Sequence, residues 1–131
     1  MDTKLMSTSS DLPKNFRSLD DIQEYLRTFA HERDWEKFHA PKNLAMALAV
    51  EASELMEIFQ WLPEEGSRHL TIEQMSEVEA EMADVFLYLL RMADVLKIDL
   101  MAASERKTVL NEQRYPVEKA KGHATKYTNL D

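Results

Sequence analysis

Apolar residues recur at the spacing of one helix face in four stretches of this chain. We expect amphipathic helices over residues 19 to 33, 41 to 61, 72 to 97 and 100 to 113. Three of these starts carry a local signal, because Ser18 opens a capping-box-like pattern, Pro41 suits a first helical turn and Asp99 can cap a helix. Only 2 Gly and 4 Pro are present, too few for a turn-rich β fold of this length. The pattern therefore predicts an all-α fold.

Acidic residues interrupt the apolar faces of the second and third predicted helices. The second helix presents Leu44, Leu48, Leu55, Phe59 and Leu62, and the third presents Val78, Val85, Leu89, Met92 and Leu96. Glu51 falls inside the first of these faces and Glu54 on its border. Glu81 and Asp84 repeat the same i, i+3 spacing on the next helix. Burying several carboxylates in a helix interface is costly unless a cation compensates them, so we expect a metal site here.

The residue types at this site indicate which metal it would hold. Four carboxylates without a thiolate or an imidazole are the ligands of Mg²⁺ or Mn²⁺ rather than of Zn²⁺. Di-iron bundles use Glu-x-x-His pairs, and none of His31, His39, His69 and His123 follows a suitable Glu on a core face by three residues. A hard metal among carboxylates most often holds a phosphate oxygen. The acid pairs thus favour phosphate chemistry.

Two other groups of residues have the chemistry to meet a phosphorylated ligand. Lys107, Asn111 and Arg114 follow one another at i, i+4 and i+7, so they form a polar and basic line that can donate to phosphate oxygens. An ordinary solvated helix face fits the same spacing. Trp35 and Phe38 lie with His39 in the break between the first two helices. Those two rings could line a ligand pocket or close one end of the hydrophobic core, and their spacing fits both roles.

Net charge, apolar runs and cysteine content indicate which partners and which cellular compartment to expect. The formal net charge is −8, which argues against general binding of nucleic-acid polymers because such surfaces need an excess of Lys and Arg. No apolar run approaches the length of a membrane span, and the first fifteen residues lack the apolar core of a signal peptide. The chain has no cysteine, which fits a reducing compartment, so we expect a cytoplasmic protein. We expect a flexible arm over residues 1–17, one domain over 18–115 and a basic tail over 116–131.

The motifs and their order resemble those of the MazG-like all-α nucleoside triphosphate pyrophosphohydrolases, and within them the dCTP pyrophosphatase branch. The resemblance covers roughly Leu19 to Leu130. It is carried by E-R-D-W-E-K-F-H at 32–39, P-K-N-L at 41–44, E-A-S-E at 51–54, F-Q-W at 59–61, E-M-A-D at 81–84 with Tyr88, Asn111 with R-Y-P at 114–116, and K-Y-T at 126–128. So many matching blocks in one order are far more specific than the acid motif alone.

The resemblance implies an architecture, a reaction and a set of site residues. The expected architecture is a four-helix MazG-like bundle that assembles as a homo-oligomer, commonly a dimer of dimers. The implied reaction is Mg²⁺-dependent hydrolysis of dCTP or a modified dCTP to the monophosphate and pyrophosphate, in sanitation of the nucleotide pool. The implied catalytic and metal-binding residues are Glu51, Glu54, Glu81 and Asp84. The implied substrate-binding residues are Trp35, Phe38, His39, Trp61 and Tyr88 near the base, sugar and metal, and Lys107, Asn111, Arg114, Tyr115, Lys126 and Tyr127 near the phosphates.

Two positions depart from the pattern of the wider family. Val50 stands where many MazG-like members carry another Glu, and the dCTP branch also lacks that Glu, which supports the assignment to the branch. Leu26 replaces a substrate-contacting histidine expected in the first helix of the animal dCTP enzymes, so the choice of base stays open. Two alternatives also stay open. One is the same reaction on another triphosphate, such as dUTP or a non-standard nucleotide, and the other is a helical oligomerisation or regulatory module without catalysis.

Overall fold

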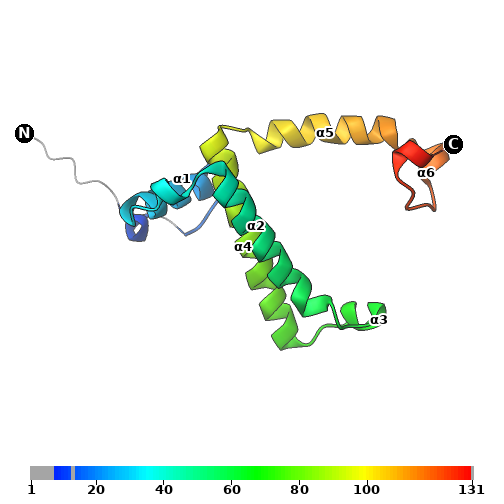
Figure 1. Cartoon of the computed structure of the whole chain (residues 1–131), viewed down its shortest axis with the longest axis horizontal. Helices are drawn as coiled ribbons and strands as arrows, with labels where there is room; N and C mark the ends of the chain where they lie inside the picture. The colour runs from blue at the N-terminus through cyan, green and yellow to red at the C-terminus, as the bar shows by residue number, and fades with distance from the viewer. Residues whose placement is uncertain (1–7, 13, 131) are drawn as a thin grey trace, which may run out of the picture. The chain divides into compact units, whose positions relative to one another are not determined.

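The computed structural model describes residues 8–12 and 14–130, which form helices joined by turns and irregular segments and contain no β-strand. Figure 1 shows the elements in chain order. They are η1 (Ser9–Asp11), α1 (Leu19–Glu32), η2 (Glu36–Phe38), α2 (Pro41–Phe59), α3 (Glu64–Ser67), α4 (Ile72–Leu96), α5 (Leu100–Arg114), α6 (Val117–Ala120) and η3 (Tyr127–Asn129). The predicted all-α class is confirmed. The chain divides into two compact units, Met1–Lys97 and Ile98–Asp131, and each is described by itself.

The four long helices begin and end within about two residues of their predicted bounds, and a side-chain cap sets the start of three of them. The Ser18 side chain accepts a hydrogen bond from the Asp21 amide at 3.1 Å at the start of α1. At the start of α4, Thr71 and Gln74 form a reciprocal capping box, with bonds of 3.1 and 2.9 Å between side chain and backbone. The predicted cap at Asp99 is confirmed by its 3.0 Å bond from the Ala102 amide.

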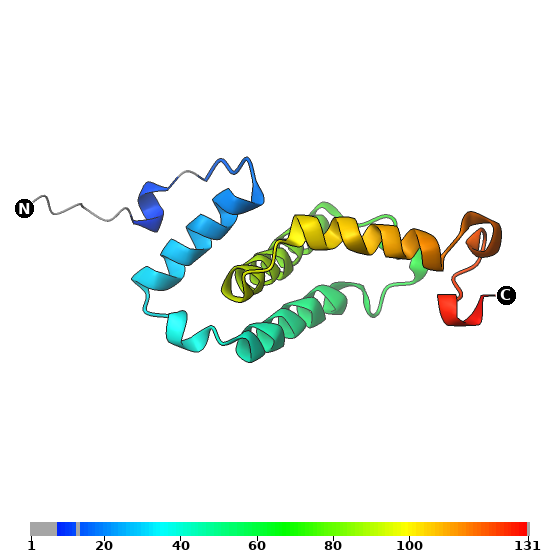
Figure 2. The same cartoon turned by 90° about the horizontal axis from the view of Figure 1, so that it is seen from above.

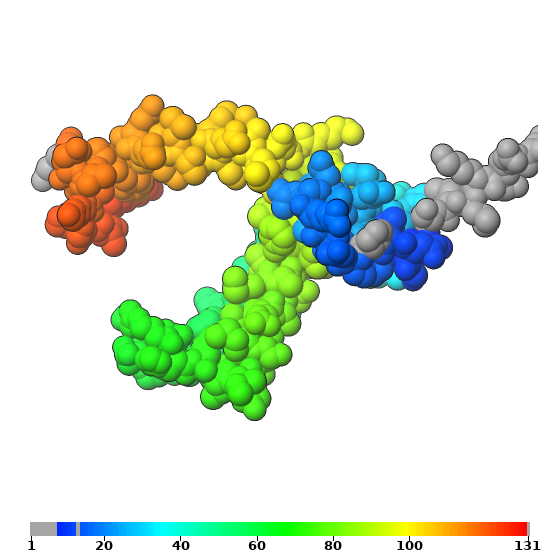
Figure 3. Space-filling view, turned by 180° about the vertical axis from the view of Figure 1, so that it is seen from behind, coloured from blue at the N-terminus to red at the C-terminus, as the bar shows by residue number. Residues whose placement is uncertain are grey.

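In the first unit, α2 and α4 lie side by side and run in opposite directions (Figures 1 and 2). Leu44 of α2 and Leu90 of α4 are its most buried large side chains, with exposed fractions of 1% and 0%. A second contact joins α1 to the C-terminal part of α4, which Figure 3 shows covered by the first helix. There the Gln23 side-chain amide donates to the Leu90 carbonyl at 3.1 Å.

The apolar face predicted for the third long helix was partly wrong. Val78 is buried as expected, but Leu89 and Leu96 are exposed, while Leu90 and Ala93 are buried in their place. The reason is that α4 contacts two helices, α2 and α1. The face of its C-terminal part that contacts α1 lies outside the apolar stripe predicted from the sequence. This second face carries polar residues that the site uses.

The second unit consists of α5 followed by two short helices. The Arg114 guanidinium lies 4.4 Å from the centre of the Tyr127 ring, and the rings of Tyr115 and Tyr127 meet edge to face with centres 6.0 Å apart. The end of the chain therefore folds back on the C-terminal end of α5. Within the part of the chain that the structure describes, no helix has both the length and the apolar character needed to cross a membrane.

The predicted N-terminal arm is described only in part, since residues 1–7 and 13 lie outside the described residues. In the described part, Ser9 is buried, and its hydroxyl donates to a carboxylate oxygen of Glu32 at 2.6 Å. The Lys14 ammonium donates to the Ser9 carbonyl at 2.8 Å. These contacts join η1 to the end of α1.

Candidate functional site

Three of the four predicted carboxylates meet between α2 and α4. Glu51 comes from α2, and Glu81 and Asp84 come from one turn of α4. One oxygen from each lies within 4.8 Å of the other two. The i, i+3 spacing puts Glu81 and Asp84 on one side of α4, and the antiparallel pairing of the helices brings Glu51 opposite them. This acid cluster, defined as Glu51, Glu81 and Asp84, has the geometry of ligands around one ion.

Burial and neighbouring negative charges act together on the acid cluster. Burial and the neighbouring carboxylates, Glu54 foremost, raise the pKa of Glu51 from 4.5 to about 7. Burial and the same group of charges also raise the pKa of Glu81. One oxygen of each of these two residues, Oε2, is buried and receives no hydrogen bond from any described residue. A hard divalent cation would satisfy both oxygens and remove the repulsion, so the donor set fits such an ion.

The fourth predicted ligand, Glu54, lies beside the acid cluster at its solvent side. It lines an acidic hollow of about 430 Å³ with Glu57, Ile58, Glu77 and Glu81. Its charge is among the causes of the raised pKa of both Glu51 and Glu81, so it acts on the same cluster. Glu77, one turn before Glu81 on α4, shares this hollow.

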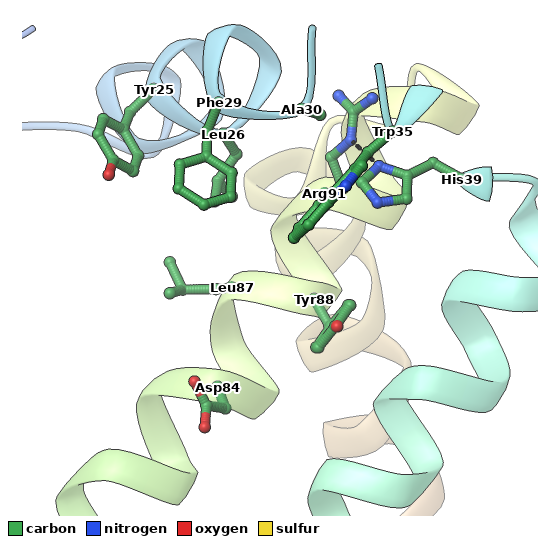
Figure 4. Close-up of a pocket in the computed structure, with 10 residues that line it drawn as sticks. All are labelled: Tyr25, Leu26, Phe29, Ala30, Trp35, His39, Asp84, Leu87, Tyr88 and Arg91. Carbon is green, nitrogen blue, oxygen red and sulfur yellow. Dashed lines mark hydrogen bonds between the residues drawn. The ribbon is translucent and has the colours of Figure 1, made fainter. Parts of the chain in front are cut away.

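A second cavity, of about 320 Å³, adjoins the acid cluster through Asp84. Figure 4 shows its walls, which come from α1, from the connection between α1 and α2, and from α4. Its lining residues are Tyr25, Leu26, Phe29, Ala30, Trp35, His39, Asp84, Leu87, Tyr88 and Arg91. Mostly apolar walls with a few polar groups are usual for a site that binds a small molecule. Because Asp84 belongs to both, a ligand in this cavity would lie next to the carboxylates.

The predicted base-contacting residues of the first unit fall into two groups. Trp35, His39 and Tyr88 line the cavity, with Trp35 held edge to face against Phe29 at 5.7 Å between ring centres. Phe38 and Trp61 are not among the lining residues within this chain, and they are 59% and 87% exposed. Leu26, at the position of the missing histidine, is part of the wall.

The predicted phosphate-contacting residues all belong to the second unit. Lys107, Asn111 and Arg114 lie on α5, and Tyr115, Lys126 and Tyr127 follow it. Lys107 and Asn111 are exposed, whereas Arg114 is half-buried by its contact with Tyr127. Within this unit the structure brings together Arg114, Tyr115 and Tyr127.

The basic residue of the cavity wall, Arg91, was not predicted from the sequence. Its side chain donates from Nε to Nδ1 of His39 at 3.0 Å and from a terminal nitrogen to Asp94 at 3.3 Å. The signal was present in the spacing, because Asp84, Tyr88 and Arg91 follow at i, i+4 and i+7 and so share one side of α4. Burial and the Arg91 charge lower the pKa of His39, so its ring is neutral at neutral pH.

Comparison with known proteins gives agreeing results for sequence and structure. The dCTP pyrophosphatase 1 of Bos taurus is 40% identical over 129 residues, which make up 95% of this chain and 76% of that protein. The dCTP pyrophosphatase 1 of Rattus norvegicus is 42% identical over 115 residues, 86% of this chain and 68% of that protein. A crystal structure of a pyrophosphatase from Archaeoglobus fulgidus superposes with a TM-score of 0.72 at 38% identity, covering 79% of this chain and 97% of that chain.

The match to a family extends over most of both units. Residues 46–130 match the MazG-like family, and this range includes the whole acid cluster and the four-residue motifs that supply it. The relatives named above are similar over a still larger part of the chain. The chain therefore belongs to the MazG-like family.

Proposed function

We propose that this protein is a nucleoside triphosphate diphosphatase that hydrolyses dCTP to dCMP and pyrophosphate with Mg²⁺, and so removes dCTP from the nucleotide pool. The observation that carries the proposal is the acid cluster, whose buried oxygens receive no hydrogen bond from the described residues and which adjoins an aromatic cavity through Asp84. The relatives named dCTP pyrophosphatase 1 support this choice of substrate. Mn²⁺ has similar ligand preferences and is an alternative metal.

The metal would supply charge stabilisation for the phosphate oxygens and for the departing pyrophosphate. Glu51, Glu54, Glu81 and Asp84 would hold it. In the proposed reaction, the oxygen of a water molecule forms a bond to the α-phosphorus, and the bond from that phosphorus to the oxygen bridging to the β-phosphate breaks. A carboxylate of the site accepts the proton that the water loses. The reaction thus leaves the base and sugar unchanged.

The base would occupy the cavity lined by Trp35, His39 and Tyr88. Its volume of about 320 Å³ lies in the range of pockets that enclose small organic ligands. Trp35 offers a ring face or edge to a base, and His39 and Arg91 are polar groups in an otherwise mostly apolar wall. In this placement the phosphates would extend toward Asp84 and the acid cluster.

The oligomeric state and several residue roles stay predictions. We propose a homo-oligomer, with a dimer of dimers as the expected form, because apolar side chains of α2 and α4 are exposed in the single chain. They include Met46, Val50, Met56, Met82 and Phe86. Phe38 and Trp61 are proposed to act near the base, and Lys107, Asn111, Arg114, Tyr115, Lys126 and Tyr127 at the phosphates. The cytoplasmic nucleotide pool is the proposed place of action.

The deciding experiment incubates the purified protein with Mg²⁺ and each common nucleoside triphosphate in turn. We expect dCTP to give dCMP and pyrophosphate, and Asp84→Asn to give neither, because this change keeps the size of the side chain and removes its charge. Glu79→Gln is the matched control, since Glu79 is an exposed acid on the same helix outside the acid cluster. Release of inorganic phosphate in place of pyrophosphate would refute the bond assignment, and faster cleavage of dUTP or a non-standard nucleotide would refute the substrate.

A further inference from the structure

Arg91 is a buried charged residue whose hydrogen bonds reach both the cavity and the contact between α1 and α4. It is 8% exposed, and Asp94, its acidic partner, also accepts two bonds from Arg27 of α1 at 3.0 and 2.8 Å. A buried guanidinium needs such a partner, and Asp94 supplies the negative charge. The other hydrogen bond of the Arg91 side chain, from Nε to Nδ1 of His39, compensates no charge. This bond calls for a different explanation.

The direction of that bond fixes the position of the proton on His39. An arginine side chain has donors and no acceptor, so Nδ1 of His39 must accept and must carry a lone pair. The neutral ring then has its proton on Nε2. The opposite orientation of the ring would place a carbon against Nε of Arg91 and leave a buried donor without an acceptor. His39 is therefore held in one of its two neutral tautomers.

The protonated nitrogen of His39 faces away from Arg91. Figure 4 shows Nδ1 on the dashed bond to Arg91 and the second ring nitrogen on the side of Tyr88. Nε2 makes no hydrogen bond with the described residues, and His39 belongs to the cavity wall. The cavity thus contains a donor of fixed identity and no partner from its own wall. A ligand that places an acceptor there would complete the pair.

We propose that Arg91 is a positioning residue that holds His39 as an Nε2–H donor, and that this donor faces ring position N3 of the base and so favours cytosine over uracil. This inference rests on the proposed function, since it names how the same site selects its substrate. Cytosine has an unprotonated N3, which accepts a hydrogen bond, whereas N3 of uracil carries a hydrogen. A donor that faces a donor leaves both groups without a partner, which is the arrangement that polar sites reject most strongly.

The tautomer can be measured on the free protein, without substrate or metal. We would label the histidines with ¹⁵N, assign His39 by its loss in His39→Gln, and read the tautomer from the ring nitrogen shifts at neutral pH. We expect the Nε2–H form in the wild type and in Arg91→Lys, which keeps a donor. Arg91→Met should give a mixture of both tautomers. Arg27→Met is the matched control, because it removes the other arginine from Asp94 and leaves the bond to His39 in place.

The same variants test base selection through the ratio of kcat/KM for dCTP to that for dUTP. Arg91→Met should lower this ratio about tenfold, the size expected for one neutral hydrogen bond. Arg91→Lys and Arg27→Met should keep it near the wild-type value. An Nδ1–H form of His39 in the wild type, or an unchanged ratio in Arg91→Met, would overturn the proposal.

The two proposals can fail separately in these experiments. If no triphosphate is cleaved by the wild type, the proposed function fails, whereas the tautomer of His39 is still measured by its spectrum. If dCTP is cleaved and the ratio of kcat/KM for dCTP to that for dUTP is unchanged in Arg91→Met, the function stands and the role of Arg91 is refuted. The wild-type spectrum is assigned with His39→Gln and does not depend on Arg91→Met, so the tautomer remains testable even if Arg91→Met does not fold.

Discussion

The replacement Glu51→Gln is expected to make the metal-free protein more stable while it abolishes turnover. In the folded chain, the Glu51 carboxylate is half-buried among three other acids, one of its oxygens lacks a hydrogen bond from the described residues, and its pKa is raised to about 7. Above that pH, the ionised group costs folding free energy. Glutamine has the same shape without the charge, and its amide can donate to the neighbouring carboxylates.

The size of the effect follows from the pKa. At about 1.4 kcal/mol for each pKa unit, a rise from 4.5 to about 7 corresponds to about 3.5 kcal/mol. We reduce this to about 2 kcal/mol because solvent screens a group that is only half-buried. For a chain of 131 residues, that gain should raise the melting temperature by about 8 °C. Mg²⁺ at 100 times its dissociation constant would stabilise the wild type by about 2.7 kcal/mol, and we expect little of that gain in the variant.

The assay is thermal unfolding at about pH 8, in EDTA and in excess Mg²⁺, for the wild type, Glu51→Gln and the control Glu79→Gln. The control should melt like the wild type in both buffers, since Glu79 is exposed and lies outside the acid cluster. The reasoning fails if Glu51→Gln melts below the wild type in EDTA. It also fails if Mg²⁺ stabilises the wild type and the variant equally.

Three further predictions concern pH, the core and a helix cap. Because the pKa of Glu51 is raised, between about pH 4.5 and 7 the folded state keeps a proton that the unfolded state releases. The metal-free wild type should therefore lose stability as the pH rises through this range. Urea unfolding should show a smaller loss in Glu51→Gln. Leu90→Ala should cost about 2–5 kcal/mol in the same assay, because Leu90 is fully buried, and a loss below about 1 kcal/mol would contradict the packing described for α4. Thr71→Ala should cost about 1 kcal/mol through loss of the capping box, whereas Thr71→Ser should retain most of that stability.

The sequence was most informative where the determinants are local. Helix bounds followed from apolar spacing and from caps such as Ser18 and Asp99, whose partners lie three residues away. The meeting of Glu51 with Glu81 and Asp84 was also predictable, because consecutive amphipathic helices bury their apolar faces against each other and the acids interrupt those faces. The role that each acid plays in catalysis stays a prediction.

The parts that sequence reasoning missed depend on long-range packing. Leu89 was predicted on the buried face and Leu90 was not. The apolar spacing in α4 predicts a single buried face, whereas the helix packs against two neighbouring helices. Arg91 shares a side of α4 with Asp84 and Tyr88, yet its partner His39 lies 52 residues earlier in the chain. Only the packing of α1 and η2 against α4 identifies that bond, so no pattern within one helix could have predicted it.

Hydrolysis of dCTP between its α and β phosphates can be followed with an isotope. The protein would be incubated with dCTP and Mg²⁺ in water enriched in ¹⁸O, and the products examined by mass spectrometry. We predict dCMP that carries one ¹⁸O atom and pyrophosphate that carries none, because water attacks the α-phosphorus. Label in the pyrophosphate, or dCDP with inorganic phosphate as the products, would contradict the account.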